Sequence, residues 1–506
     1  MVNNLNDDFS KLTNTVMNIK YKIINNNLLL LLFLGGLIVY RLIICFNYTP
    51  EISTGETNNI WNALQVANGK AVYSNPEDTP FEIFQYTPLS QLPIVAAAKL
   101  FNNVEDNYYY KVMVVGRLFS LLYNILTFYL LFLLLKNILK VSNTLSLAAA
   151  LCGFGLLTHL AFAIRPDSLS LLLIISSIFL FLKAYFENKI IYYGACGFGF
   201  AMSFFAKQDS FLIISALGLC LMFSKDWKNV FILAGSFIFS ISVLLFIFNV
   251  LYGEFFFFSI FGGLSIGYSL EQVHAVFERF LQFYGLFFYA SILVVYLIYR
   301  NVVKEKEKLF FLSLILTSFL LAISISFKIG SWVNYYTPFV IYSIMLIYFV
   351  ISYISEGNKK EIVDSALTYF TIIIVSIFVV QQIYHYTSPF IKFEKSKSQH
   401  LEMAKSLKIF KNEAIQKKYQ VFTFDKATKL FLFENTILPN TEFYHVSKFS
   451  VKGYKTLNKN KKLSHIIKIK ETDESQFSTL KYYHVPFIEY KEKLNLTKYI
   501  IYEHER

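Results

Sequence analysis

The sequence predicts a mostly α-helical, polytopic membrane protein of about 11 transmembrane helices, with a long first outer loop and a small α/β domain at its C-terminus. Of the 506 residues, 55% are hydrophobic and only 16% are charged, whereas a soluble domain usually has about a quarter charged residues. The mean hydropathy is +0.47. Many apolar runs approach the roughly 18–20 residues that span a bilayer. A membrane protein with many spans is therefore expected.

The N-terminal segment, residues 1–26, is polar and rich in asparagine, and we expect it to lie in the cytoplasm. It precedes the run LLLLLFLGGLIVYRLIICF. This run is long for a cleaved signal peptide and no small-residue cleavage site follows it, so it is interpreted as a retained signal anchor.

The membrane domain is predicted to extend over residues 27–389. Each candidate span is an apolar run bounded by polar residues or by Gly and Pro. The eleven candidates lie near 27–46, 112–135, 144–164, 168–186, 190–206, 210–224, 229–251, 280–299, 308–327, 337–354 and 364–386.

Lysine and arginine residues predict the orientation. They cluster before the first span and in every second loop after it, namely at 20–22, 136–140, 183–189, 225–228, 300–308 and 359–360. Such loops lie on the cytoplasmic side by the positive-inside rule. We therefore expect a multi-pass protein of the cell (inner) membrane, with the N-terminus cytoplasmic and the C-terminal domain extracytoplasmic.

The first outer loop, residues 47–111, contains one clear helical pattern. Glu56 opens an amphipathic run in which Ile60, Trp61 and Leu64 recur at helical spacing. This pattern predicts a helix that lies in the membrane interface, with its apolar face against the lipid.

Polar residues gather on the predicted outer face, several of them at span ends in loops of only a few residues. They are Glu51, Glu56, Arg117, His159, Arg165, Asp167, Lys207, Gln208, Asp209, Glu254 and the run from Lys328 to Tyr336. Charges at membrane depth are rare, costly and usually functional. This set favours a polar functional site at the outer surface, although any single short loop can carry ordinary solvated charge.

The C-terminal segment, residues 390–506, differs in composition and predicts a small α/β domain. LEMAKSLKIFKNEAIQ has a helical pattern, and QVFTFD, HIIKIK and KYIIYEHE are typical of strands. It holds 23 Lys and Arg against 13 Asp and Glu, so it carries +10 of the net charge of +13. The excess predicts a solvated surface or attraction to anionic membrane lipids. No nucleic-acid partner is expected, because no recognition motif is present.

Five short motifs in a fixed order carry a resemblance to a known family. They are GE…VYSNPEDTP…YTPL, GRLFSLL, RPDSL, AKQDS and KIGSWVNYY. In this order the chain resembles the multispanning GT-C-fold glycosyltransferases, in the bacterial branch related to protein mannosyltransferases and lipid A aminoarabinose transferases. The resemblance covers nearly the whole chain and implies a GT-C-like membrane domain.

The resemblance implies a reaction in which a sugar moves from a polyprenyl-phosphate donor to a glycan, lipid or protein acceptor. A carboxylate would take the acceptor proton in a direct displacement. Glu56 lies in the loop that carries the catalytic carboxylate of this family, and Glu51 is the second candidate.

Cations are needed to hold the donor phosphate, because negative charge develops there as the sugar leaves. The predicted phosphate ligands are Arg117, Arg165, Lys207 and Lys328. The predicted substrate ligands are Asp167, Gln208, Asp209, Asn334, Tyr335 and His159. No metal-ligand spacing is present and no definite cofactor is predicted. Carboxylates such as Glu51, Glu56, Asp167 and Asp209 leave a divalent cation as an open alternative.

Two other functions remain as alternatives at this stage. A polymerase or ligase of lipid-linked glycans has the same need for phosphate binding, but its large outer loop usually lies later in the chain. A transporter tends to place ionisable groups at mid-membrane on broken helices in paired halves. Here the charged residues collect at one surface.

Overall fold

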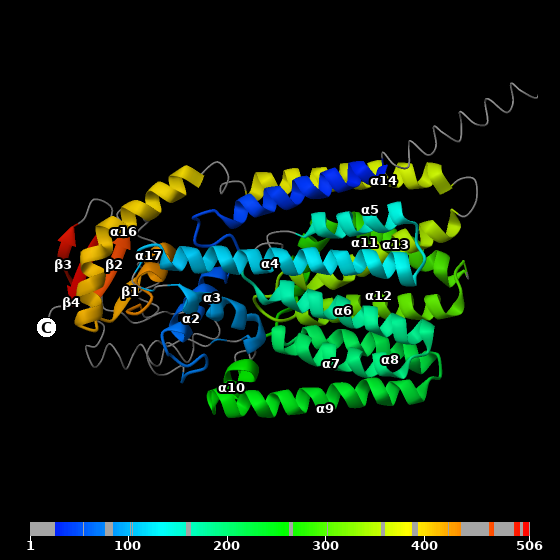
Figure 1. Ribbon diagram of the computed structural model, residues 1–506, viewed down its shortest axis with the longest axis horizontal. Coiled ribbons are helices and arrows are strands. Elements are labelled where there is room, and N and C mark those ends of the chain that lie inside the picture. The colour runs from blue at the N-terminus through cyan, green and yellow to red at the C-terminus, as the bar shows by residue number, and fades with distance from the viewer. Residues whose placement is uncertain are drawn as a thin grey trace, which may run out of the picture.

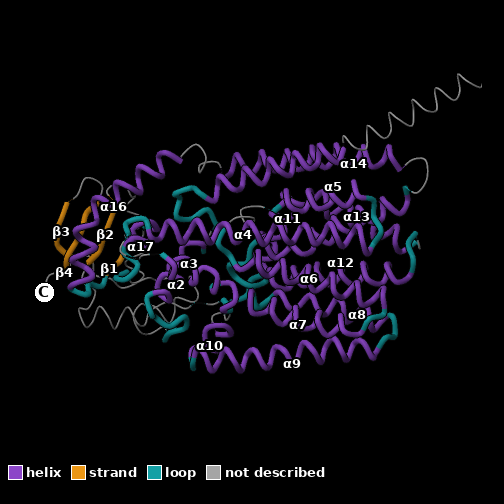
Figure 2. Tube along the Cα trace, in the orientation of Figure 1, coloured by secondary structure: helices purple, strands orange, loops and turns teal. Residues whose placement is uncertain are grey.

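The computed structural model describes residues 26–53, 55–75, 84, 86–101, 103, 105–157, 163–262, 267–300, 302–355, 360–386, 393–423, 425–436, 465–469, 490–495 and 499–504. These residues form a long bundle of roughly parallel helices, with a smaller cap of helices and strands at one end (Figure 1). Among the residues that Figure 2 colours by secondary structure, the strands lie in this cap.

Eight helices in the described ranges are long and apolar enough to cross a membrane. They are Asn26–Cys45, Tyr108–Ile138, Pro166–Glu187, Trp227–Tyr252, Leu270–Tyr299, Glu305–Ser326, Val333–Ile354 and Glu361–Gln381. Shorter apolar helices occupy the other three predicted positions, namely Asn143–Leu156, Ile190–Ala206 and Ser210–Phe223. The helical membrane fold is confirmed, whereas a count of eleven full spans stays a prediction.

In Figure 1 the bundle helices carry the labels α4 to α9 and α11 to α14. Their bounds are α4 Tyr108–Leu133, α5 Asn143–Leu156, α6 Pro166–Glu187, α7 Ile190–Ala206, α8 Ile214–Phe223, α9 Trp227–Tyr252, α11 Leu270–Tyr299, α12 Glu305–Ser326, α13 Thr337–Ile354 and α14 Lys360–Tyr386. A π-helical turn, Leu134–Ile138, continues α4, and a 3₁₀ turn, Ser210–Ile213, precedes α8.

Several helices begin at residues that satisfy their free N–H groups. The side chains of Ser142 and Ser269 accept hydrogen bonds from the backbone N–H groups of Leu145 and Gln272. Pro166 occupies the first position of α6, where its missing N–H costs nothing. The Arg-Pro-Asp motif thus marks a sharp helix start.

The cap combines the first loop with the C-terminal segment. Its helices are α2 Glu56–Ala67, α3 Leu92–Leu100, α16 Phe393–Gln416 and α17 Lys426–Phe431, and its strands are β1 Val421–Thr423, β2 His465–Ile469, β3 Tyr490–Asn495 and β4 Tyr499–His504. The sheet has the order β1-β2-β4-β3; β1 and β2 are parallel and the other pairs are antiparallel. The three predicted strands are confirmed, and β3 was not predicted.

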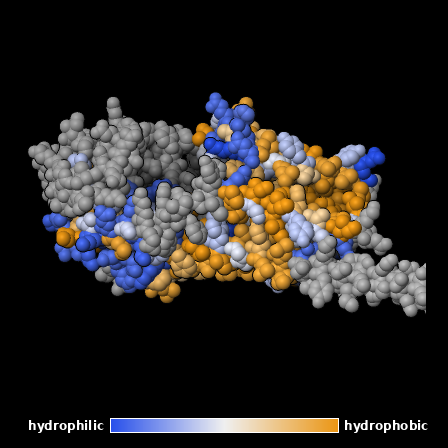
Figure 3. Space-filling model, turned by 90° about the horizontal axis from the view of Figure 1, so that it is seen from above, coloured by the Kyte–Doolittle hydropathy of each residue, from blue (hydrophilic) through white to orange (hydrophobic). Residues whose placement is uncertain are grey.

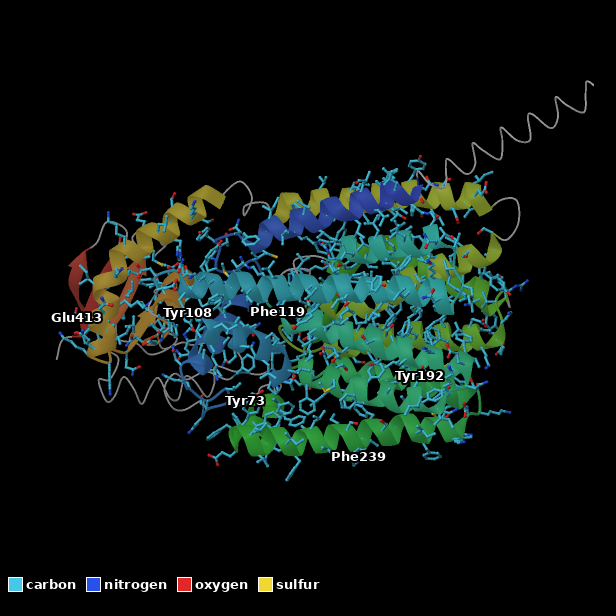
Figure 4. The ribbon with its side chains drawn as sticks, in the orientation of Figure 1. Tyr73, Tyr108, Phe119, Tyr192, Phe239 and Glu413 are labelled. Atoms are coloured by element: carbon cyan, nitrogen blue, oxygen red, sulfur yellow. The ribbon has the colours of Figure 1, made fainter. Side chains whose placement is uncertain are left out.

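One hydrophobic cluster joins the two parts of the cap. It contains Trp61 and Leu64 of α2, Tyr108 at the start of α4, and Leu407 and Ile501 of the C-terminal segment. Figure 4 shows Tyr108 where α4 meets the C-terminal elements. The helix α2 is confirmed, but its predicted place on the lipid is wrong, because protein covers its apolar face. Apolar periodicity alone does not tell a lipid from a protein neighbour.

The surface agrees with a membrane environment. Figure 3 shows hydrophobic residues over the bundle and hydrophilic residues towards the end that carries the sheet. The helix α9 has only Leu233 buried, and Phe239, labelled in Figure 4, is 71% exposed. Such an apolar face suits lipid tails. Which end of the bundle faces the cytoplasm stays a prediction.

Small residues let α9 approach α7 closely. A Cβ atom at Gly197 would lie 2.7 Å from the carbonyl oxygen of Leu233 and 2.9 Å from the nitrogen of Phe237. The Ser236 hydroxyl also donates a 2.6 Å hydrogen bond to the carbonyl of Gly194. Close backbone contact at small residues is a usual way for membrane helices to associate.

We predict that Gly197→Ala destabilises the protein by about 1–3 kcal/mol, the usual cost of overpacking, because the added methyl meets backbone that cannot move aside. Gly194→Ala is the matched control, since a Cβ there meets nothing within 4 Å. Thermal unfolding in detergent measures both variants. Equal melting temperatures for the two would contradict this account of the α7–α9 contact.

Candidate functional site

The candidate site lies at the helix ends that face the cap. The segment 163–165 leads into α6, and Asp167 lies in the first turn of that helix. Arg165 Nε is 3.1 Å from Asp167 Oδ2. Asp167 Oδ1 lies 3.1 Å from Lys207 Nζ and accepts a 2.8 Å hydrogen bond from the Asn334 amide. Asp167 is thus the centre at which three separate loops meet.

Lys207 bridges two carboxylates. It follows the last residue of α7, and its ammonium lies 3.1 Å from Asp167 and 3.2 Å from Asp209 Oδ2. The ammonium also lies 4.3 Å from the centroid of the Tyr335 ring, within cation–π range. Burial lowers the pKa of Lys207, but the two carboxylates outweigh burial and hold the pKa above its usual value. Lys207 is therefore a permanent cation.

Lys328 lies beside this cluster on a turn fixed by its backbone. The Ile329 N–H donates to the carbonyl of Gly267 at 2.9 Å, and Gly330 takes a positive φ of 84° that favours glycine. Burial lowers the pKa of Lys328 to about 8; Asp209 opposes this shift and Lys207 adds to it. In the described part of the chain, no carboxylate forms an ion pair with Lys328.

An open cavity extends from these charges into the bundle. Asp167, Lys207, Asp209, Asn334 and Tyr335 line its polar end. Farther into the bundle the walls are apolar, with Leu171, Ile174, Ile213, Leu321, Ala322 and Ile325. The cavity therefore suits a ligand with an anionic group at one end and an apolar chain at the other.

Glu56 does not lie at this cavity, contrary to the prediction that it is the catalytic base. Its side chain has no exposed surface, and its two oxygens lie 2.8 and 3.0 Å from Nε and Nη2 of Arg117. The same oxygens accept hydrogen bonds from the N–H groups of Ile52 and Ile164. The structure assigns Glu56 to holding the first loop on α4.

Arg117 is likewise removed from the set of phosphate ligands. Besides Glu56, its guanidinium donates to the carbonyls of Asn47 and Thr49 at 2.8 and 2.7 Å. The side chain is fully buried and these contacts use four of its five N–H donors, so the guanidinium is not open to a phosphate.

Glu51 also has a structural role. Its oxygens accept hydrogen bonds from the Gly55 N–H and the Thr57 hydroxyl, at 3.1 and 2.8 Å, and it forms an ion pair with Lys426 of α17. It therefore stabilises the start of α2 and ties the first loop to the C-terminal segment. Its side chain is 7% exposed and it does not line the cavity.

The other predicted ligands divide into three groups. The first group lies together at the charged end of the cavity and consists of Arg165, Asp167, Lys207, Asp209, Lys328, Asn334 and Tyr335. Gln208 is buried and donates to the carbonyl of Ile260 at 3.3 Å, outside the cavity lining. His159 lies outside the described residues.

Further cavity residues were not predicted from the sequence. Asn124, Ser168, Ser170, Ser210 and Ser318 add hydroxyl and amide groups to the lining. A polar residue inside an apolar span is a recognisable signal for Asn124. Serines carry no such signal, because they are common in buried helices.

Within the described ranges, no group of three or more His, Cys, Asp or Glu side chains is placed to hold a metal ion. Asp167 and Asp209 share Lys207 between them. Their nearest ionic partner is thus a protein cation.

Comparison with known proteins agrees with this architecture. Residues 97–252 match the family model described as dolichyl-phosphate-mannose-protein mannosyltransferase. No curated protein matches the chain significantly.

Solved structures match over nearly the whole chain. ArnT from Cupriavidus metallidurans matches with a TM-score of 0.58 in its apo state and 0.56 when bound to undecaprenyl phosphate. Both structures are 11% identical in sequence to this chain. Each match covers 93% of this chain and 97% of the ArnT chain. The Archaeoglobus fulgidus oligosaccharyltransferase, in complex with Zn and sulfate, matches with a TM-score of 0.52 and 11% identity over 92% of this chain and 73% of its own.

These matches show that the chain has the fold of these multi-pass membrane proteins. The predicted resemblance to GT-C-fold glycosyltransferases related to protein mannosyltransferases and aminoarabinose transferases is confirmed.

The Glu56–Arg117 pair generates a stability prediction. Glu56→Ala leaves a buried guanidinium without its counter-charge, so it should destabilise the protein by about 3–5 kcal/mol. Glu105→Ala is the control: its ion pair with Lys111 has side chains 42% and 36% exposed, and exposed pairs contribute about 0–1 kcal/mol. Thermal unfolding in detergent compares them. A folded Glu56→Ala protein with the melting temperature of Glu105→Ala would contradict the assigned role.

Proposed function

We propose that this protein is a glycosyltransferase that moves a sugar from a polyprenyl-phosphate donor to a glycan, lipid or protein acceptor outside the cytoplasm. The observation that carries the proposal is the cavity, which joins a cluster of charges at the helix ends to apolar walls inside the bundle. A polyprenyl-phosphate sugar has this same division between an anionic head and an apolar chain.

The charge balance of the cluster favours an anion. The cluster contains three cationic side chains, Arg165, Lys207 and Lys328, and two carboxylates, Asp167 and Asp209. Positive charge is therefore in excess. Lysine binds phosphate as a point charge, and arginine can bind it through two parallel hydrogen bonds. Undecaprenyl phosphate bound to the similarly folded ArnT supports this choice of ligand.

The chemistry that follows is a direct displacement at the anomeric carbon. An acceptor hydroxyl attacks this carbon, the bond from the carbon to the phosphate oxygen breaks, and polyprenyl phosphate leaves with the electron pair. Lys207 and Lys328 stabilise the charge that develops on the leaving phosphate, and their effect is large because the site is partly shielded from water.

The proposed activity predicts that purified protein in nanodiscs releases polyprenyl phosphate from at least one member of a panel of polyprenyl-phosphate-linked sugars. Lys207→Gln should lower this release by about 10²–10³-fold, the usual effect of removing one group that stabilises the transition-state charge. Lys228→Gln is the control, since Lys228 is exposed at the start of α9. Saturable uptake of a solute, with no release from any donor, would favour a transporter.

Lys328 predicts a pH dependence of donor binding. With a pKa of about 8, its ammonium is charged below pH 8 and loses its charge as the pH rises. Undecaprenyl phosphate keeps a constant charge above about pH 7, because its second pKa is about 6. Its apparent Kd should therefore rise by up to about tenfold per pH unit above 8.

Lys328→Arg keeps its charge at every pH in this range and should remove the dependence. The measurement is a titration of the protein in nanodiscs with undecaprenyl phosphate between pH 7.5 and 9.5. A flat profile in the wild type, or an unchanged slope in Lys328→Arg, would show that Lys328 does not contact the phosphate.

A further inference from the structure

The proposed reaction needs a carboxylate that can accept a proton, and the two carboxylates predicted for this role are both engaged elsewhere. Glu56 is enclosed in its pair with Arg117, and Glu51 is engaged by Gly55, Thr57 and Lys426. Neither lines the cavity. Among the described residues, the carboxylates that line it are Asp167 and Asp209.

These two carboxylates differ in how many of their oxygens form hydrogen bonds or ion pairs. Asp167 Oδ1 contacts Lys207 and Asn334, and its Oδ2 accepts from Arg165. Asp209 Oδ2 pairs with Lys207, whereas its Oδ1 is shielded from solvent and has no hydrogen-bond partner among the described residues. A shielded carboxylate oxygen without a donor is costly, and such exceptions need an explanation.

We propose that Asp209 Oδ1 is the general base of the transfer. This proposal rests on the proposed function. As the acceptor oxygen bonds to the anomeric carbon, its proton passes to Asp209 Oδ1, while the bond to the phosphate oxygen breaks and its electron pair leaves with polyprenyl phosphate. After product release the proton passes from Asp209 to water, which restores the carboxylate.

The position of Asp209 suits this role. The turn that carries it is fixed, because the single O–H of Ser210 is shared between the carbonyls of Ser203 and Lys207. Lys207 lies 3.2 Å from Asp209, so a phosphate held by Lys207 brings the anomeric carbon close to the base. An acceptor hydroxyl hydrogen-bonded to Asp209 Oδ1 would then lie within reach of that carbon, and such prior alignment lowers the barrier.

The experiment compares wild type with Asp209→Asn in nanodiscs, by release of polyprenyl phosphate from the panel of donors and by binding of undecaprenyl phosphate. Asn keeps the shape but cannot accept the proton, so turnover should fall by about 10²–10⁴-fold. Binding of undecaprenyl phosphate should not weaken, because Lys207 and Lys328 are unchanged.

Glu105→Gln controls for the loss of a carboxylate at a distance from the cavity, and Asp209→Ser carries the test if Asp209→Asn does not fold. Near-normal turnover of either Asp209 variant would overturn the assignment and leave the proposed function standing. Parallel loss of turnover and of undecaprenyl phosphate binding would overturn it in favour of a ligand-holding role. A wild type that releases nothing would overturn the proposed function and this role with it.

Discussion

The buried ion pair between Glu56 and Arg117 is the contact on which the arrangement of the site depends. It joins the first turn of α2 to the half of α4 that lies nearer the cap, and it also reaches the segment before α6. Glu56 accepts the N–H of Ile164, and the Asn59 amide donates to the carbonyl of the same residue at 2.8 Å. Both backbone groups of Ile164 are thus held by α2. Arg165 and Asp167 follow directly, so the first loop sets where the charged end of the cavity lies.

The bilayer explains why the site is built from helix ends. An ionised side chain in the middle of an apolar span is costly, whereas the end of a span meets water and other loops. Asp167, Lys207 and Lys328 each occupy such an end. The helices bring these ends together, and each charge then neutralises part of its neighbour. Lys207, which serves two carboxylates at once, keeps Asp167 and Asp209 in a single cluster.

Sequence patterns predicted the spans well, because hydropathy and helical length are local properties. They also predicted most members of the charged cluster, because the sequence shows which charges lie in short loops on one face. They failed where a partner decides the role: nothing local shows that Glu56 meets Arg117, 61 residues later. The strand β3 was missed because it is an edge strand with the charged sequence YKEKLN, and edge strands commonly carry charge that blocks further pairing.

The shared core of the cap has a consequence for how the chain is made. The Trp61 indole donates to the hydroxyl of Thr436, a residue 375 positions later. The ribosome adds roughly 5–20 residues per second. Trp61 therefore leaves the ribosome long before Thr436 has been synthesised. The part of the first loop that packs on the C-terminal segment therefore stays uncovered until nearly all the helices have been made. Closure of the cap is a late, long-range step of biogenesis, and contacts of such sequence separation form slowly.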